Sequence, residues 1–97
     1  MKLRFTPRAA QDIAAIADYI QARSPGAAQQ VRAAILHSLQ ILVLFPQVGR
    51  AQAVEGARKL VTRKYPYLVY YRIDEVAEEI VILTIQHAAR EREYEDG

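Results

Sequence analysis

Apolar residues recur at helical spacing in the first part of the chain. Four of them are spaced i, i+3, i+4 and i+7, so they share one face of a helix: Ile13, Ile16, Ala17 and Ile20. Thr6 is a residue type that caps helix N-termini, and Pro7 suits the first helical position. The pattern therefore predicts a helix over residues 7–23, preceded by a short strand over residues 2–5.

A second apolar stripe begins after Ser24-Pro25-Gly26, which repeats the cap-then-proline signal. Its members recur every three or four residues: Ala28, Val31, Ile35, Leu39 and Leu42. Pro46 ends this helix near Leu44, because the residue before a proline avoids the helical region. The connection between the two helices is so short that we expect them to be antiparallel neighbours.

The second half of the chain changes to short runs of β-prone residues. Three strands are predicted, over residues 58–62, 67–73 and 80–86, and residues 46–56 are predicted to form a loop before the first of them. The connections between the three runs are short and polar, which favours an antiparallel meander. The last run is apolar on both faces, as is typical of a central strand.

These elements fit one small domain over residues 1–97, because a chain of this length has no room for a second core. The predicted order is βααβββ, an α+β fold in which a helical hairpin packs on one face of a small antiparallel sheet. The pattern leaves open where the first strand joins that sheet. Residues 91–97 form a charged C-terminal tail.

Composition narrows the class of protein. The chain has no cysteine, which excludes disulfides and thiolate metal sites, and its only histidines, His37 and His87, are too far apart in sequence to predict a zinc site. The N-terminus has no apolar leader, and no apolar run approaches the ~20 residues that cross a bilayer. We therefore expect a cytoplasmic protein with no membrane segment, no cofactor and no metal.

Charge is distributed unevenly along the chain, although its net value is only +2. Residues 1–72 hold eleven Lys and Arg against three acids, a net charge of +8, whereas residues 73–97 carry −6. The basic side chains are densest between residues 58 and 72. Such a patch favours a polyanion or an acidic protein as partner, although basic side chains that merely solvate a sheet face would explain it equally well.

Four short motifs occur in order on the predicted elements. The loop after the second helix carries Phe45-Pro46-x-x-Gly49-Arg50, and Gly56-x-Arg58 opens the next strand. Tyr65-Pro66-Tyr67 precedes Val69-Tyr70-Tyr71-Arg72, and Ile85-x-His87-Ala88-Ala89-Arg90 lies near the end. With these motifs the chain resembles the ParE/RelE toxins over about residues 3–92, and the ParE-like branch in particular.

The resemblance implies the toxin half of a bacterial type II toxin–antitoxin module of the plasmid-stabilisation kind. Such a toxin forms a hetero-oligomer with a cognate antitoxin, which is ParD-like or another small DNA-binding protein. ParE-like members poison DNA gyrase, whereas RelE-like members cleave mRNA on the ribosome. Because the fold is common to both, three interpretations stay open: a gyrase inhibitor, which leads, a ribosome-dependent mRNA endonuclease, and an antitoxin-binding member without toxicity.

The endonuclease interpretation requires acid–base chemistry and cations around a phosphate. His87 titrates in the suitable pH range, and Arg58 and Arg90 could hold phosphate oxygens. Equally, His87 could close a strand end with a hydrogen bond, and Arg58 could pair with an acid or a loop carbonyl. Nucleases of the His-Tyr type in this family carry a tyrosine directly after the terminal histidine, whereas Ala88 follows His87 here and the only later tyrosine is Tyr94. This departure favours the gyrase inhibitor, which needs no catalytic residue on this chain.

Two sets of binding residues are expected from that interpretation. The target-binding set is basic: Arg58, Lys59, Arg63, Lys64, Arg72 and Arg90. The antitoxin-binding set is apolar or aromatic: Ile13, Ile20, Tyr67 and Tyr71. A two-helix hairpin over one sheet face is thin, so exposed apolar surface should remain as a groove for an antitoxin helix or strand. The tyrosines could instead stack bases or fill a sheet face.

Overall fold

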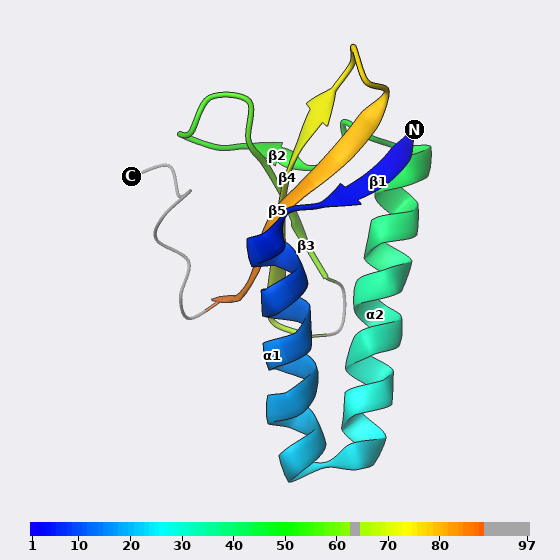
Figure 1. The fold of residues 1–97 in the computed structure, drawn as a ribbon, viewed down its shortest axis with the longest axis vertical. Helices are drawn as coiled ribbons and strands as arrows, with labels where there is room; N and C mark the ends of the chain where they lie inside the picture. Colours follow the sequence, from blue (N-terminus) through cyan, green and yellow to red (C-terminus); the bar gives the residue numbers. More distant parts are fainter. Residues whose placement is uncertain (63–64, 89–97) are drawn as a thin grey trace.

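The computed structural model describes residues 1–62 and 65–88. In these ranges the chain forms two helices and five strands (Figure 1). In chain order they are β1 (Lys2–Phe5), α1 (Pro7–Arg23), α2 (Pro25–Leu44), β2 (Arg50–Ala51), β3 (Arg58–Val61), β4 (Tyr67–Asp74) and β5 (Glu79–His87). The tail expected at residues 91–97 lies outside the described residues.

The two helices begin and end where the sequence predicts. The Thr6 hydroxyl accepts a hydrogen bond from the backbone N–H of Ala9 at 3.0 Å, and Pro7 occupies the first turn of α1. Ser24 lies between the helices, although its side chain makes no capping hydrogen bond. Since this single residue connects them, α1 and α2 run antiparallel and side by side (Figure 1).

The five strands form one sheet in the order β1-β5-β4-β3-β2. β3, β4 and β5 pair antiparallel, as predicted, and β2 adds a further antiparallel pair with β3. β1 runs parallel to β5, so the sheet is mixed rather than wholly antiparallel. The predicted loop over residues 46–56 contains the two-residue strand β2. A turn in which Gly56 has φ +79° then returns the chain to β3, which explains a glycine at this position.

The core lies between the helical hairpin and one face of the sheet. Alternate residues of β4 and β5 face it, including Val69 and Tyr71 on β4 and Ile82 on β5. From α2 the predicted stripe supplies the opposing side chains: Val31, Ile35, Leu39 and Leu42. β5 lies between β1 and β4, as the apolar run predicts for a central strand, and its apolar residues are buried on both faces of the sheet except Leu83, which is half-buried.

Beyond the end of β1, helix α1 and its N-cap supply the hydrogen-bond partners along this edge of β5. The Thr6 hydroxyl donates to the carbonyl of Leu83 at 2.8 Å. Nearly two turns further along α1, the Asp12 carboxylate accepts hydrogen bonds from the Thr84 hydroxyl and, at 3.1 Å, from the backbone N–H of Ile85. A β-bulge in the pairing of β4 with β5 lies at the same level. The helix therefore satisfies backbone groups that a longer β1 would otherwise pair.

Candidate functional site

A buried tyrosine joins the loop after α2 to the sheet. The Tyr71 hydroxyl donates to the carbonyl of Pro46 at 2.7 Å and accepts from the backbone N–H of Gly49 at 2.8 Å. Tyr71 has no exposed surface. Burial raises the pKa of Tyr71, and the Gly49 hydrogen bond and the nearby Arg58 charge oppose that shift. The hydroxyl thus fixes two points of the loop against the core.

Glycine is required at position 49 by this arrangement. A Cβ built there would lie 2.5 Å from Cε1 of Tyr71, well inside van der Waals contact. Only a residue without a side chain lets the backbone come close enough to hydrogen-bond the phenol. The family-like motif Phe45-Pro46-x-x-Gly49-Arg50 therefore has a structural explanation in the packing of Tyr71.

Arg58 reinforces the same loop from β3. Its guanidinium donates to the carbonyls of Gly49 at 2.8 Å and Gln47 at 3.3 Å. Arg58 pairs with Tyr71 across the strands, so the two side chains hold the loop from neighbouring positions. We refer to residues 46–49, held by Tyr71 and Arg58, as the clamped loop. The contact with loop carbonyls is the structural role that the sequence left as an alternative to target binding.

His87 lies at the opposite end of the strands from Arg58. It is exposed at the end of β5, with its ring edge-on to that of Tyr67 at a centroid distance of 5.6 Å. The register pairs His87 with Tyr67 and Arg58 with Tyr71, so the two pairs are about 13 Å apart along β4. The backbone register therefore does not bring Arg58 and His87 to one point, as phosphate chemistry using both would require.

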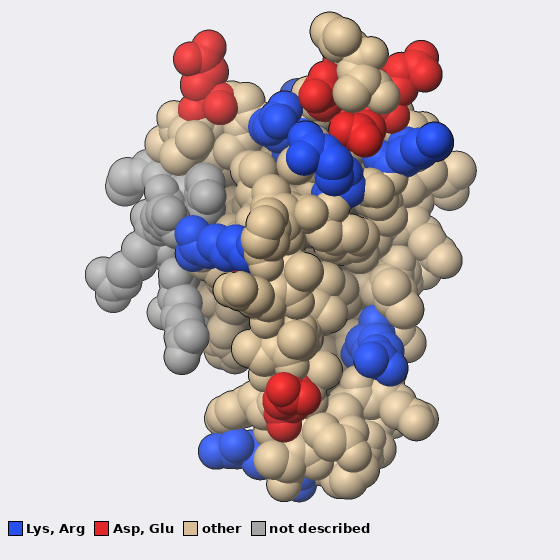
Figure 2. All heavy atoms as spheres, viewed as in Figure 1, with Lys and Arg blue, Asp and Glu red and all other residues tan. Residues whose placement is uncertain are grey.

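Basic residues gather on the sheet face that turns away from the helices. The register places Arg50 beside Lys59 and Arg4 in line with Arg72, all on that face. Arg4 pairs with Glu79 at 3.0 Å, and Arg72 lies 4.0 Å from Asp74. Figure 2 shows Lys and Arg atoms beside Asp and Glu atoms at the end of the molecule that carries the β4–β5 turn. Of the expected target-binding residues, Arg63, Lys64 and Arg90 lie outside the described residues.

The expected antitoxin-binding residues are less accessible than the sequence suggests. Ile13 and Ile20 are half-buried and pack against the core. Tyr67 is 8% exposed and Tyr71 is completely buried, so Tyr71 offers no surface to a partner in this conformation. Burial raises the pKa of Tyr67, and the neighbouring Tyr19 raises it further. These tyrosines fill the sheet face, which is one of the two roles that the sequence allows.

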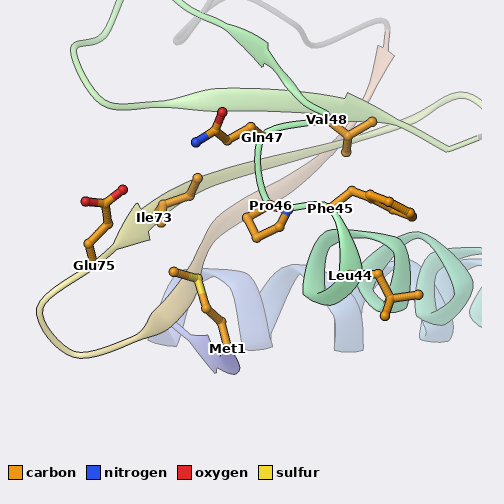
Figure 3. Close-up of a pocket in the computed structure, with 8 residues that line it drawn as sticks. All are labelled: Met1, Leu44, Phe45, Pro46, Gln47, Val48, Ile73 and Glu75. Carbon is orange, nitrogen blue, oxygen red and sulfur yellow. The ribbon is translucent and has the colours of Figure 1, made fainter.

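An apolar groove lies between the C-terminal end of α2 and the end of β4. Its volume is about 550 Å³, and Figure 3 shows the side chains that line it. They are Met1, Leu44, Phe45, Pro46, Gln47, Val48, Ile73 and Glu75. The sequence predicts exposed apolar surface but does not place it here, because the groove combines Met1, the end of α2, the clamped loop and the end of β4. Within residues 1–62 and 65–88, no three His, Asp or Glu side chains gather closely enough to hold a metal ion.

No helix in the described part of the chain has both the length and the apolar character needed to cross a membrane.

Comparison with known protein families gives one match over nearly the whole chain. The profile of the family described as the ParE toxin of type II toxin–antitoxin system, parDE, matches residues 3–92. No curated protein sequence matches the chain significantly.

Solved structures with the same fold belong to toxin–antitoxin systems. A chain of the chromosomal ParDE system from Pseudomonas aeruginosa is 30% identical, with a TM-score of 0.77 over 90% of this chain and 95% of that chain. A chain of the RelBE2 toxin–antitoxin complex from Mycobacterium tuberculosis is 26% identical, with a TM-score of 0.61 over 89% and 88%. The isolated Escherichia coli RelE toxin is 17% identical, with a TM-score of 0.68 over 94% and 87%, and shows the fold alone.

Proposed function

Because the chain belongs to the ParE toxin family of type II toxin–antitoxin systems, we propose that it is held inactive by a cognate antitoxin and that its cytoplasmic target is DNA gyrase. The toxin role follows from family membership. The identity of the target rests on the ParE-like resemblance and on the geometry of the residues that a nuclease would use.

An antitoxin partner is consistent with both the relatives and the surface. The P. aeruginosa relative comes from a ParDE system, and the M. tuberculosis relative was solved as a toxin–antitoxin complex. This chain also exposes several large apolar side chains, among them Leu44 and Phe45. A contiguous apolar surface on a small protein is a common sign of a protein–protein interface.

The arrangement of Arg58 and His87 is the observation that favours gyrase over mRNA. A nuclease that uses both must bring a cation and an acid–base group to one phosphate. Here Arg58 is bonded to loop carbonyls, and His87 lies at the other end of the strands. A toxin that acts by binding gyrase needs neither group to be free for chemistry.

Induced expression without antitoxin tests the proposal. Gyrase-dependent double-strand breaks and cell filamentation, with mRNA intact, are the expected result. Cut mRNA with undamaged DNA would replace gyrase by the ribosome as the target. Normal growth with verified folded protein would leave only an antitoxin-binding role.

A single substitution separates the two targets more sharply. His87→Ala should leave toxicity within about twofold if the chain acts by binding gyrase elsewhere on its surface. An endonuclease that uses His87 as acid or base should lose about 100-fold or more in cleavage. His37→Ala is the matched control, because His37 is also exposed but lies on α2.

A further inference from the structure

The face of the sheet that turns away from the helices carries basic side chains from one edge to the other. Because Val69 and Tyr71 face the core, their neighbour Arg72 lies on the opposite face, and the strand register places three more cations there. We refer to the four as the basic strip: Arg4 on β1, Arg72 on β4, Lys59 on β3 and Arg50 on β2.

The basic strip spans the whole sheet. The strand order β1-β5-β4-β3-β2 puts four strand spacings between Arg4 and Arg50, which is about 19 Å. One strand of duplex DNA carries a phosphate for about every 3.4 Å of helix axis, so about five phosphates lie along this distance. The cations of the strip are therefore spaced widely enough for each to meet a different phosphate.

The accessible surface of the strip is cationic rather than apolar. Val81 lies between Arg4 and Arg72 in the register. Tyr70 lies beside Lys59, and neither Tyr70 nor Val81 is more than 1% exposed. The side chains of Arg4 and Arg72, in contrast, are 48% and 43% exposed. Protein interfaces have an apolar centre, whereas interfaces with DNA are polar and strongly basic, so the strip fits DNA better than it fits an acidic protein.

Two acids lie on the same face, next to the β4–β5 turn. Glu79 pairs with Arg4 at 3.0 Å, and Asp74 lies 4.0 Å from Arg72. Both pairs are partly exposed, so water screens them and a phosphate can replace the carboxylate at little cost. At the other end of the strip, Arg50 is exposed and makes no ion pair with any residue that the structure describes. A phosphate therefore meets no competing carboxylate at Arg50.

We propose that the basic strip binds the backbone of the duplex DNA that gyrase holds, so that the toxin contacts the enzyme and its DNA together. The proposal rests on the proposed function, because it assumes gyrase as the target, and it adds DNA as a second binding partner. Phosphate contacts carry no sequence information, so the strip holds DNA of any sequence and the enzyme determines where the toxin acts. A toxin that bridges the two slows the release of DNA from the enzyme.

The affinity of the toxin for gyrase, with and without DNA, tests the proposal. The DNA is a linear duplex that gyrase cleaves. It should raise the affinity of the wild-type toxin about 10-fold at low salt. The double variant Arg50→Ala/Arg72→Ala should lose this gain and keep the affinity measured without DNA. Arg23→Ala/Arg32→Ala is the matched control, because it removes the same charge from exposed positions on α1 and α2 and should keep the gain.

Salt dependence measures the number of phosphate contacts. Each lost contact lowers the slope of log affinity against log salt concentration by about 0.9. Arg50→Ala should lower the slope by this amount when gyrase and DNA are both present, whereas Arg32→Ala should leave it unchanged. Arg50→Lys keeps the charge and should restore the slope of the wild type.

Removal of an acid should have the opposite effect, which a damaged fold cannot imitate. Asp74→Asn removes the carboxylate beside Arg72, so it should raise the affinity for gyrase with DNA about 2- to 5-fold at low salt and less at high salt. Asp18→Asn makes the same charge change at an exposed position on α1 and should have a clearly smaller effect.

The outcomes distinguish this inference from the proposed function. If DNA raises the affinity of Arg50→Ala/Arg72→Ala as much as that of the wild type, the strip does not bind DNA and only this inference fails. If the double variant binds gyrase more weakly without DNA, the strip meets a protein surface and the inference is overturned. If the wild-type toxin binds gyrase in neither condition, the proposed function itself fails. Thermal unfolding verifies that each variant is folded.

Discussion

One phenol connects residues that are far apart in the sequence. The Tyr71 hydroxyl uses both its donor and its acceptor capacity on the backbone of the clamped loop. Three of the short motifs that mark the family resemblance meet at this point, through Gly49, Arg58 and Tyr71. The shared purpose of these motifs is then to position a loop, and their presence alone does not indicate catalysis.

Gly49→Ala should destabilise the protein. The added methyl group overlaps the ring of Tyr71, and pushing the loop away stretches both hydrogen bonds of the phenol, so the free energy of unfolding should fall by about 1–3 kcal/mol. Urea unfolding measures it. Gly26→Ala is the control in the opposite direction: nothing lies within 4 Å of its added Cβ, and alanine in the first turn of α2 should raise stability by up to about 1 kcal/mol. Equal stability of the two variants would contradict this explanation of Gly49.

Alkaline pH should unfold the protein through its buried phenols. The pKa values of Tyr67 and Tyr71 are raised above the ordinary 10.0, mainly by burial. The folded state therefore holds these protons more tightly than the unfolded state, so the stabilisation is fully present below pH 10.0 and is lost as the pH rises beyond it. Unfolding by urea at a series of pH values, with tyrosinate absorbance as a second signal, tests this.

Tyr71→Phe separates the phenols from other groups that titrate at high pH. The variant should be less stable at neutral pH, because it leaves the Gly49 N–H and the Pro46 carbonyl without their partner, at a cost of about 1–3 kcal/mol. Its stability should nevertheless decline less steeply above pH 10.0 than that of the wild type. An unchanged alkaline slope in Tyr71→Phe would exclude this residue as a cause.

At the scale of elements, α1 acts as an extension of the sheet edge. β1 pairs with β5 only from Glu79 to Ile82, and beyond this point Thr6 and Asp12 bond the strand instead. The amphipathic pattern of α1 explains how its inner face packs but says nothing of Asp12, which lies beside that face. The helix is therefore fixed to the sheet by polar contacts as well as by burial of its apolar stripe.

Asp12→Ala should destabilise the C-terminal half of β5. The change leaves the Ile85 N–H and the Thr84 hydroxyl without their acceptor, so stability should fall by about 1–3 kcal/mol. Hydrogen exchange should speed up at Ile85 before it does at Ile80, which is paired with β1. Asp18→Ala is the matched control on the same helix, since Asp18 is exposed and should change stability by less than about 0.5 kcal/mol. Similar losses in both variants would argue against the bonding role of Asp12.

Elements with strong local signals could be predicted from the sequence. The helices follow from their spacing and from proline at each start, and both have the predicted bounds. The parallel pairing of β1 with β5 could not be predicted, because the partners are separated by most of the chain. Strand β2 is too short for any periodicity and exists only because β3 lies beside it. Local pattern thus determines the helices, whereas long-range pairing determines the sheet order.

The candidate sites show the same contrast between local pattern and long-range pairing. Residue type marked Arg58, His87 and the tyrosines as candidates, but only the strand register shows that Arg58 and His87 lie at different ends. Exposure of apolar side chains was expected from the thinness of the fold. Its location at the end of α2 depends on Met1, Val48 and Ile73 coming together from three segments, and no sequence pattern encodes that encounter.

At the scale of the whole molecule, apolar surface and charge are arranged on different faces. The face of the sheet away from the helices carries basic residues from four strands, and among them Arg4 and Arg72 have acidic neighbours. The groove between α2 and β4 is apolar with one unpaired carboxylate among the described residues. A chain with both surfaces has room for one partner at the groove and another on the basic face.

This separation predicts that the isolated toxin is less soluble than its complex with antitoxin. Exposed Leu44, Phe45 and Val48 favour self-association, and a net charge of only +2 does little to oppose it. Co-expression with antitoxin should raise the soluble yield, and Phe45→Ser should raise the yield of the isolated toxin towards that level without the antitoxin. Sedimentation at increasing protein concentration measures the association directly. Comparable yields with and without antitoxin would show that the exposed apolar residues of the groove do not cause the free chain to self-associate.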